Sequence, residues 1–277
     1  MENFKASDGR RIAYTDTGGS GPIVLCLSGL TRDSRDFAKL KDHLAPEYRV
    51  LTMDYRGRGA SEWAADPINE YTVLVEGRDA VELLGHLGIP SVLLLGSSRG
   101  GLIGMGLAVQ TPGLIKALIL NDIGPELVPS GLDFIMTYLG RPVAYSDFDA
   151  AAAGLKAAFE GEAPDLTDDD WLDFAHDTYA DQDGKPSLSY DPKLRDAVAA
   201  AMEGPLPDLW PFYENVDCPV LVIRGANSGL LSPETVAEMK RRKPALRTAE
   251  IPNRGHCPFL DEPSSLAAIQ AFLKDYA

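Results

Sequence analysis

The sequence predicts an α/β protein, with a mostly parallel central sheet, helices on both faces and an inserted helical segment. Apolar runs of strand character recur at residues 23–28, 49–53, 91–96, 115–120, 219–223 and 247–251. Segments with helical periodicity lie between or after them, at residues 71–87, 100–110, 233–242 and 263–276. Apolar strands that alternate with helices are typical of a parallel sheet covered on both sides.

Two parts of the chain depart from this alternation. Residues 4–17 are expected to form an antiparallel hairpin with Asp8-Gly9 at its turn. No strand is expected from about 125 to 211, where an Ala-rich helix (148–159) and an aromatic helix (171–179) are predicted. Early aspartates favour the start of the second helix after Thr167. We therefore expect a core of residues 1–124 and 212–277, with a helical cap over residues 125–211.

The composition excludes several classes of partner. The chain has 277 residues, is 45% hydrophobic and 24% charged, and carries a formal net charge of −15 with a pI of about 4.6. A strongly acidic protein without a basic stripe is a poor ligand for nucleic acid or an anionic membrane. We expect a small-molecule substrate, with neither nucleic acid nor a membrane as partner. The sequence does not indicate an oligomeric state.

The cysteines and the chain's first residues bear on cofactors and location. Cys26, Cys218 and Cys257 show no metal-ligand or CxxC spacing and are expected to be buried free thiols. No metal and no cofactor are predicted. The polar start, residues 1–14, does not have the pattern of a signal peptide, and no apolar run reaches about 20 residues. A cytoplasmic location is the expectation.

The strongest chemical signal is Gly96-Ser97-Ser98-Arg99-Gly100, a G-x-S-x-G sequence between a strand and a helix. In that context a sharp turn exposes the serine at the end of the strand, and the glycines allow strand and helix to cross closely. The helix N-terminus adds positive potential near Ser98. A glycine-rich turn with an incidental serine is the alternative, and the strand–turn–helix context argues against it.

With this elbow, the chain resembles the α/β-hydrolase superfamily over nearly its whole length. The stretch CLSGLTRDSRDF (26–37) is similar to the family's oxyanion loop, although Ser28 stands where a histidine is usual. The resemblance implies an oxyanion hole formed by the backbone N–H groups of Leu30 and Arg99. It also implies a catalytic histidine after the last strand, which matches His256 in IPNRGHCPFLDEP (251–263).

The acid that orients this histidine is the open question. In most relatives it follows the strand equivalent to residues 220–223, and the matching position here is Gly229. Asp122, at the end of the strand 115–120, resembles the acid of a smaller group of relatives. Its alternative role is to fix the turn into the cap. Asn227 and Ser228 remain possible neutral partners of the histidine.

We predict an acyl-transfer mechanism with Ser98 as nucleophile, His256 as base and Asp122 as acid, acting on a small carboxylic ester or a lactone. Hydrolysis of a carbon–carbon bond in a diketone is one alternative, and a catalytically impaired ligand-binding protein is another, because of Gly229. Arg32 or Arg99 is a candidate partner of a substrate carboxylate, with a structural ion pair as the alternative. Trp171 and Trp210 are candidate lining residues of an apolar pocket under the cap.

Overall fold

The computed structural model describes residues 1–204 and 207–277. Its central sheet has eight strands in the order β1-β2-β4-β3-β5-β6-β9-β10. The strands are β1 (Glu2–Lys5), β2 (Arg11–Asp16), β3 (Ile23–Leu27), β4 (Arg49–Met53), β5 (Val92–Ser97), β6 (Ile115–Asn121), β9 (Val220–Gly225) and β10 (Arg247–Ile251). β2 pairs antiparallel with β1 and with β4, and the other neighbouring strands are parallel. The predicted α/β fold is confirmed.

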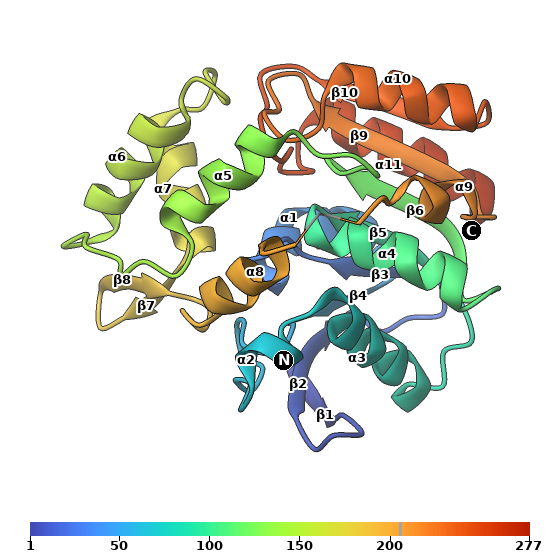
Figure 1. Ribbon diagram of the computed structural model, residues 1–277, viewed down its shortest axis with the longest axis horizontal. Coiled ribbons are helices and arrows are strands. Elements are labelled where there is room, and N and C mark those ends of the chain that lie inside the picture. Colours follow the sequence, from blue (N-terminus) through green and yellow to red (C-terminus); the bar gives the residue numbers. More distant parts are fainter. Residues whose placement is uncertain (205–206) are drawn as a thin grey trace.

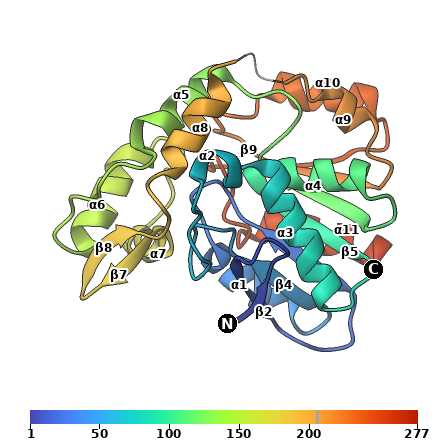
Figure 2. The same cartoon turned by 60° about the horizontal axis from the view of Figure 1, so that its bottom comes forward.

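Helices cover both faces of this sheet (Figures 1 and 2). One face packs against α3 (Val73–His86), α4 (Arg99–Gln110), α9 (Trp210–Glu214) and α10 (Pro233–Arg242). The other face packs against the short helices η1 (Ser34–Phe37) and α1 (Ala38–Leu44) and against α11 (Pro263–Tyr276). Successive β5 side chains alternate between the two cores, with Leu94 in the first and Leu93 and Leu95 in the second. This burial on both faces explains the continuous apolar runs.

The element boundaries follow local signals closely. The N-terminal hairpin is present, and Gly9 has a φ of +91° at its turn, a value that favours glycine. The predicted segments 49–53, 233–242, 247–251 and 263–276 coincide with β4, α10, β10 and α11. A short helix, α2 (Pro67–Glu70), precedes α3.

The cap forms a separate lobe, seen to the left of the sheet in Figure 1. It contains α5 (Pro129–Tyr138), α6 (Phe148–Phe159), α7 (Asp168–Thr178), β7 (Tyr179–Gln182), β8 (Lys185–Leu188) and α8 (Leu194–Met202). The expected helix start after Thr167 is present as a capping box between Thr167 and Asp170. The expectation that residues 125–211 contain no strand is wrong, because β7 and β8 pair as an antiparallel hairpin.

The cap has its own small core, in which Phe148, Leu155 and Trp171 are buried. The segment from Trp210 onward belongs to the main core instead, because α9 places Tyr213 among the side chains that pack beneath the sheet. Within the described ranges, no helix is long and apolar enough to cross a bilayer.

Candidate active site

Ser98 lies directly between β5 and α4 in a sharp turn. Its φ and ψ are 49° and −113°, a strained conformation for a residue with a side chain. A Cβ on Gly100 would overlap the carbonyl oxygen of Leu27, and one on Gly96 would overlap the backbone of Gly100. The two glycines therefore permit the close crossing that holds the Ser98 hydroxyl at the carboxyl end of the sheet.

His256 and Asp122 complete a line of hydrogen bonds with Ser98. The Nε2 atom of His256 lies 2.9 Å from Oγ of Ser98, and its Nδ1 atom lies 2.7 Å from Oδ2 of Asp122. The three residues follow β5, β6 and β10, whose carboxyl ends meet at one edge of the sheet. An N–H on Nδ1 that donates to the carboxylate leaves Nε2 free to accept the serine proton.

Further hydrogen bonds fix the orientation of the Asp122 carboxylate. The side chain is fully buried and its residue has a φ of 54°. Its Oδ1 accepts a hydrogen bond from the N–H of Gly225 at 2.9 Å, and its Oδ2 accepts one from the Ser228 hydroxyl at 2.5 Å. Donors from the strand β9 and the loop after it thus aim this carboxylate at His256.

The loop after β9 holds the Asp122 carboxylate in place. Ser228 donates to Asp122, and the Asn227 side chain donates to the carbonyl oxygen of Glu162 in the cap at 3.1 Å. The hypothesis of a neutral partner requires a hydrogen bond from one of these residues to the imidazole of His256, and neither residue forms one. A Cβ on Gly229 would meet no atom within 4 Å. Crowding at the Cβ position therefore does not explain the glycine at position 229.

The loop after β3 approaches Ser98 from the other side. A Cβ on Gly29 would lie 3.8 Å from that of Ser98. Ser28, which replaces the usual histidine, donates from Oγ to the carbonyl oxygen of Arg32 at 3.0 Å, so it closes the loop on itself. Among the described residues, the N–H groups of Leu30 and Arg99 have no hydrogen-bond acceptor. Both N–H groups are therefore available to a ligand, as the predicted oxyanion hole requires.

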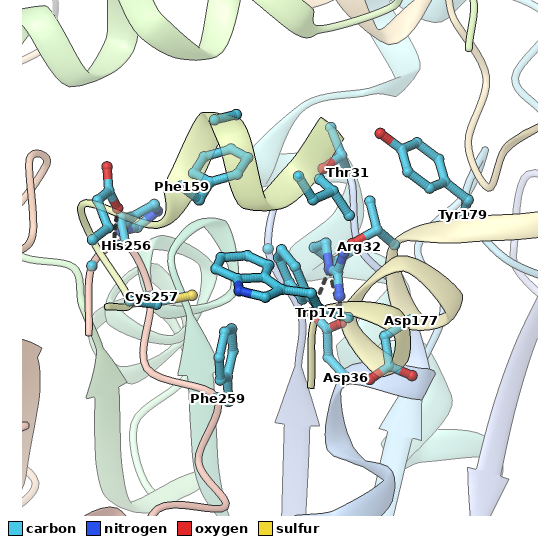
Figure 3. A pocket seen from close by; sticks show the side chains of 18 of the residues that line it. Thr31, Arg32, Asp36, Phe159, Trp171, Asp177, Tyr179, His256, Cys257 and Phe259 are labelled. Atoms are coloured by element: carbon cyan, nitrogen blue, oxygen red, sulfur yellow. Dashed lines mark hydrogen bonds and ion pairs between the residues drawn. The ribbon is translucent and has the colours of Figure 1, made fainter. Parts of the chain in front are cut away.

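Ser98 and His256 open into a cavity of about 900 Å³ between cap and core (Figure 3). Aromatic side chains from both parts line it, including Phe159 and Trp171 from the cap and Phe259 from the loop after His256. Acidic lining residues outnumber basic ones. Apolar walls with a few polar groups are typical of small-molecule sites.

The other predicted site residues have different positions. Arg32 lines the cavity, but its guanidinium forms an ion pair with Asp36 and a hydrogen bond with Thr178. Burial lowers the pKa of Arg32, but the Asp36 carboxylate outweighs this effect, and the pKa lies above its ordinary value. The Arg99 side chain is likewise bonded to Glu76. Both arginine side chains are therefore engaged in ion pairs within the protein, which was the alternative to binding a substrate carboxylate.

The two tryptophans also differ. Trp171 lines the cavity but is only 2% exposed, because it belongs to the cap core. The prediction that Trp210 lines the pocket is wrong. Its ring packs against Tyr213 and under the guanidinium of Arg242, outside the cavity, since α9 lies against the main core.

Two contacts between the cap and the histidine loop have no signal in the sequence. Oε2 of Glu162 accepts a hydrogen bond from the N–H of His256 at 3.1 Å, across 94 positions of chain. Arg254 forms ion pairs with Asp165 of the cap and with Glu262. The described part of the chain holds no cluster of side chains suited to a metal ion.

The chain belongs to the alpha/beta hydrolase family, whose model matches residues 24–269. It is 37% identical over 275 residues to a 3-hydroxybutyrate-oligomer hydrolase of Cupriavidus necator, a match that covers 95% of this chain and 92% of that protein. It is 28% identical to a 2-(acetamidomethylene)succinate hydrolase of Mesorhizobium japonicum over 92% of this chain and 89% of the relative. An alpha/beta hydrolase structure from Novosphingobium aromaticivorans superposes with a TM-score of 0.92 at 37% identity, covering 99% of this chain and 97% of that one. These similarities identify a hydrolase.

Proposed function

We propose that the protein is a serine ester hydrolase that acts on short esters of hydroxy acids, with oligomers of 3-hydroxybutyrate as the leading substrate class. The observation that carries the proposal is the hydrogen-bonded line from Ser98 through His256 to Asp122 at the wall of a large cavity. The relative named for 3-hydroxybutyrate oligomers supports the substrate class. A volume of about 900 Å³ is near the upper end of the range for drug-sized ligands, about 300–1,000 Å³, and suits a linear oligoester.

The mechanism follows from the positions of the side chains. Ser98 Oγ attacks the ester carbonyl carbon while His256 Nε2 accepts its proton, and the Asp122 carboxylate stabilises the imidazolium. The carbonyl oxygen becomes an oxyanion that accepts hydrogen bonds from the N–H groups of Leu30 and Arg99. Collapse of this intermediate releases the alcohol, which takes its proton from His256. Water, activated by the same imidazole, then releases the acid from Ser98.

The hydrogen bond between Asp122 and His256 argues against the alternative of an impaired ligand-binding protein. That alternative rested on the glycine at position 229, and Asp122 offers the missing carboxylate from another strand. None of the described lining residues favours a diketone over an ester, so a diketone serves only as a comparison substrate in the assay below.

A substrate panel tests the proposal. Linear 3-hydroxybutyrate dimer and trimer, p-nitrophenyl butyrate, a γ-lactone and a β-diketone would be compared by kcat/KM, with Ser98→Ala as the control. We expect the linear esters to be hydrolysed at least tenfold faster than the lactone and the diketone, and Ser98→Ala to be inactive on all of them. Preference for the diketone, or equal rates with Ser98→Ala, would reject the proposed function.

A further inference from the structure

A buried chain of charges lies beneath the proposed oxyanion hole. Glu76 on α3 is completely buried and lies between two arginines. Its Oε1 is 2.8 Å from Nη1 of Arg58, and its Oε2 is 2.5 Å from Nε of Arg99. One carboxylate thus bridges two guanidinium groups away from the substrate cavity, whose lining includes none of these three side chains.

Each arginine leads to one half of the oxyanion hole. Nε of Arg58 donates to the carbonyl oxygen of Leu30 at 3.0 Å. Arg99 carries the other N–H itself, and its Nη2 donates to the carbonyl oxygen of Tyr71 at 3.0 Å. Glu76 is therefore linked to Leu30 through the Arg58 side chain and to Arg99 directly. The backbone N–H groups of Leu30 and Arg99 are those proposed to bind the oxyanion.

The negative charge of Glu76 is needed to keep this arrangement. Burial lowers the pKa of Arg58, whose side chain is fully enclosed, and the neighbouring Glu76 carboxylate counters that effect. Without the carboxylate, two guanidinium groups would face each other in a region with little water, where removing one partner of an ion pair is strongly unfavourable. The arginines would move apart and take Leu30 and Arg99 with them.

We propose that Glu76 is a positioning residue that sets the distance between the Leu30 and Arg99 N–H groups. This inference rests on the proposed function, since it assigns the support of that function's oxyanion hole. Donors act on the transition state only when they point at the place where the charge develops. A displacement of about 1 Å in such a group lowers the rate by about 100-fold.

The test compares Glu76→Gln with Asp79→Asn. Asp79 lies on the same helix, is also fully buried and forms an ion pair with Arg56, which pairs with Asp8 and Glu70 as well and whose side chain bonds neither Leu30 nor Arg99. With p-nitrophenyl butyrate, Glu76→Gln is expected to lower kcat by about 10- to 100-fold and to change KM less than about twofold. A butyl trifluoromethyl ketone, which forms an oxyanion on Ser98, is expected to bind more weakly by the same factor as kcat/KM. Asp79→Asn is expected to lower the unfolding temperature but to keep kcat within about threefold.

A second variant covers the case in which Glu76→Gln does not fold. Arg99→Met keeps the backbone N–H and cuts the same connection from a side chain that is 13% exposed. It is expected to lower kcat and weaken the ketone in parallel, again with little change in KM. The inference is wrong if both variants keep the wild-type kcat, or if Asp79→Asn loses as much kcat and ketone affinity as they do. If the wild-type protein neither hydrolyses esters nor reacts at Ser98, the proposed function itself fails and the inference falls with it.

Discussion

Replacing Asp122 by asparagine tests the assignment of the acid, because the change removes a charge and keeps the shape. The amide oxygen can take the place of Oδ1, which accepts a hydrogen bond from the Gly225 N–H at 2.9 Å, and the NH2 group then takes the place of Oδ2, which faces both His256 Nδ1 and the Ser228 hydroxyl. The Gly225 N–H thus directs the amide NH2 toward His256, whose Nδ1 would then have to accept a hydrogen bond, while the Ser228 hydroxyl can turn to accept one. The proton of the neutral imidazole would move to Nε2, facing Ser98, and the histidine could no longer act as a base.

The expected loss follows from this change of tautomer. In a well-studied serine protease the same replacement lowers kcat by about 10⁴-fold, and we expect a loss of about 10³- to 10⁴-fold for Asp122→Asn. This corresponds to about 4 to 5.5 kcal/mol of transition-state stabilisation. Steady-state hydrolysis of p-nitrophenyl butyrate measures kcat, and thermal unfolding checks that the variant remains folded. A folded variant that loses less than about tenfold in kcat would refute the assignment of Asp122.

Three further changes have expected outcomes. Gly229→Asp is expected to change kcat less than about twofold in the same ester assay, because Asp122 already occupies Nδ1 of His256; a rise of orders of magnitude would identify position 229 as the true acid site. Arg141→Gln is expected to lower kcat/KM about tenfold for 3-hydroxybutyrate dimer, which carries a free carboxylate, but not for the methyl ester of that dimer, which carries none. Among the described lining residues, Arg141 is the basic side chain without an ion pair and so is available to this carboxylate; equal losses on both substrates would contradict this. Hydrogen bonds and the nearby Arg56 and Arg78 outweigh the effect of burial and lower the pKa of Asp8 from 3.8 to about 2, so its stabilisation is complete above pH 4 and is lost as the pH falls toward 2. Asp8→Asn should therefore destabilise the protein by about 1 kcal/mol at pH 6, after allowance for solvent screening, and by about half of that at pH 3, as measured by urea unfolding; a difference that does not shrink at pH 3 would contradict the assignment.

The sheet could be predicted from the sequence because each buried strand carries a local signal. Continuous apolar runs such as β5 and β6 arise from burial on both faces, and caps such as Ser232 with Pro233 mark helix starts. The cap hairpin has no apolar run, and its local signal is the Asp183-Gly184 turn, where φ is 54° and 81°. β7 and β8 are four residues each, largely polar or only partly buried, and their pairing depends on the fold around them.

The site was predictable only where its residues lie in local sequence patterns. Ser98 and His256 lie in local sequence patterns, whereas the choice between Asp122 and position 229 depends on a contact across 134 positions of chain. The position of Trp210 likewise depends on α9 packing against the core and not against the cap. The bridge formed by Glu76 joins residues from α3, the β4 loop and α4, so no stretch of sequence contains it.

Detection of a covalent acyl-enzyme tests directly whether Ser98 is the nucleophile. The intact protein would be mixed with p-nitrophenyl butyrate, quenched in acid within the first turnover, and examined by mass spectrometry with peptide mapping. We expect one butyryl group on Ser98, formed and lost at rates consistent with kcat, and no adduct in Ser98→Ala. Ester hydrolysis at full rate without an adduct on Ser98, or an adduct on another residue, would contradict this role of Ser98.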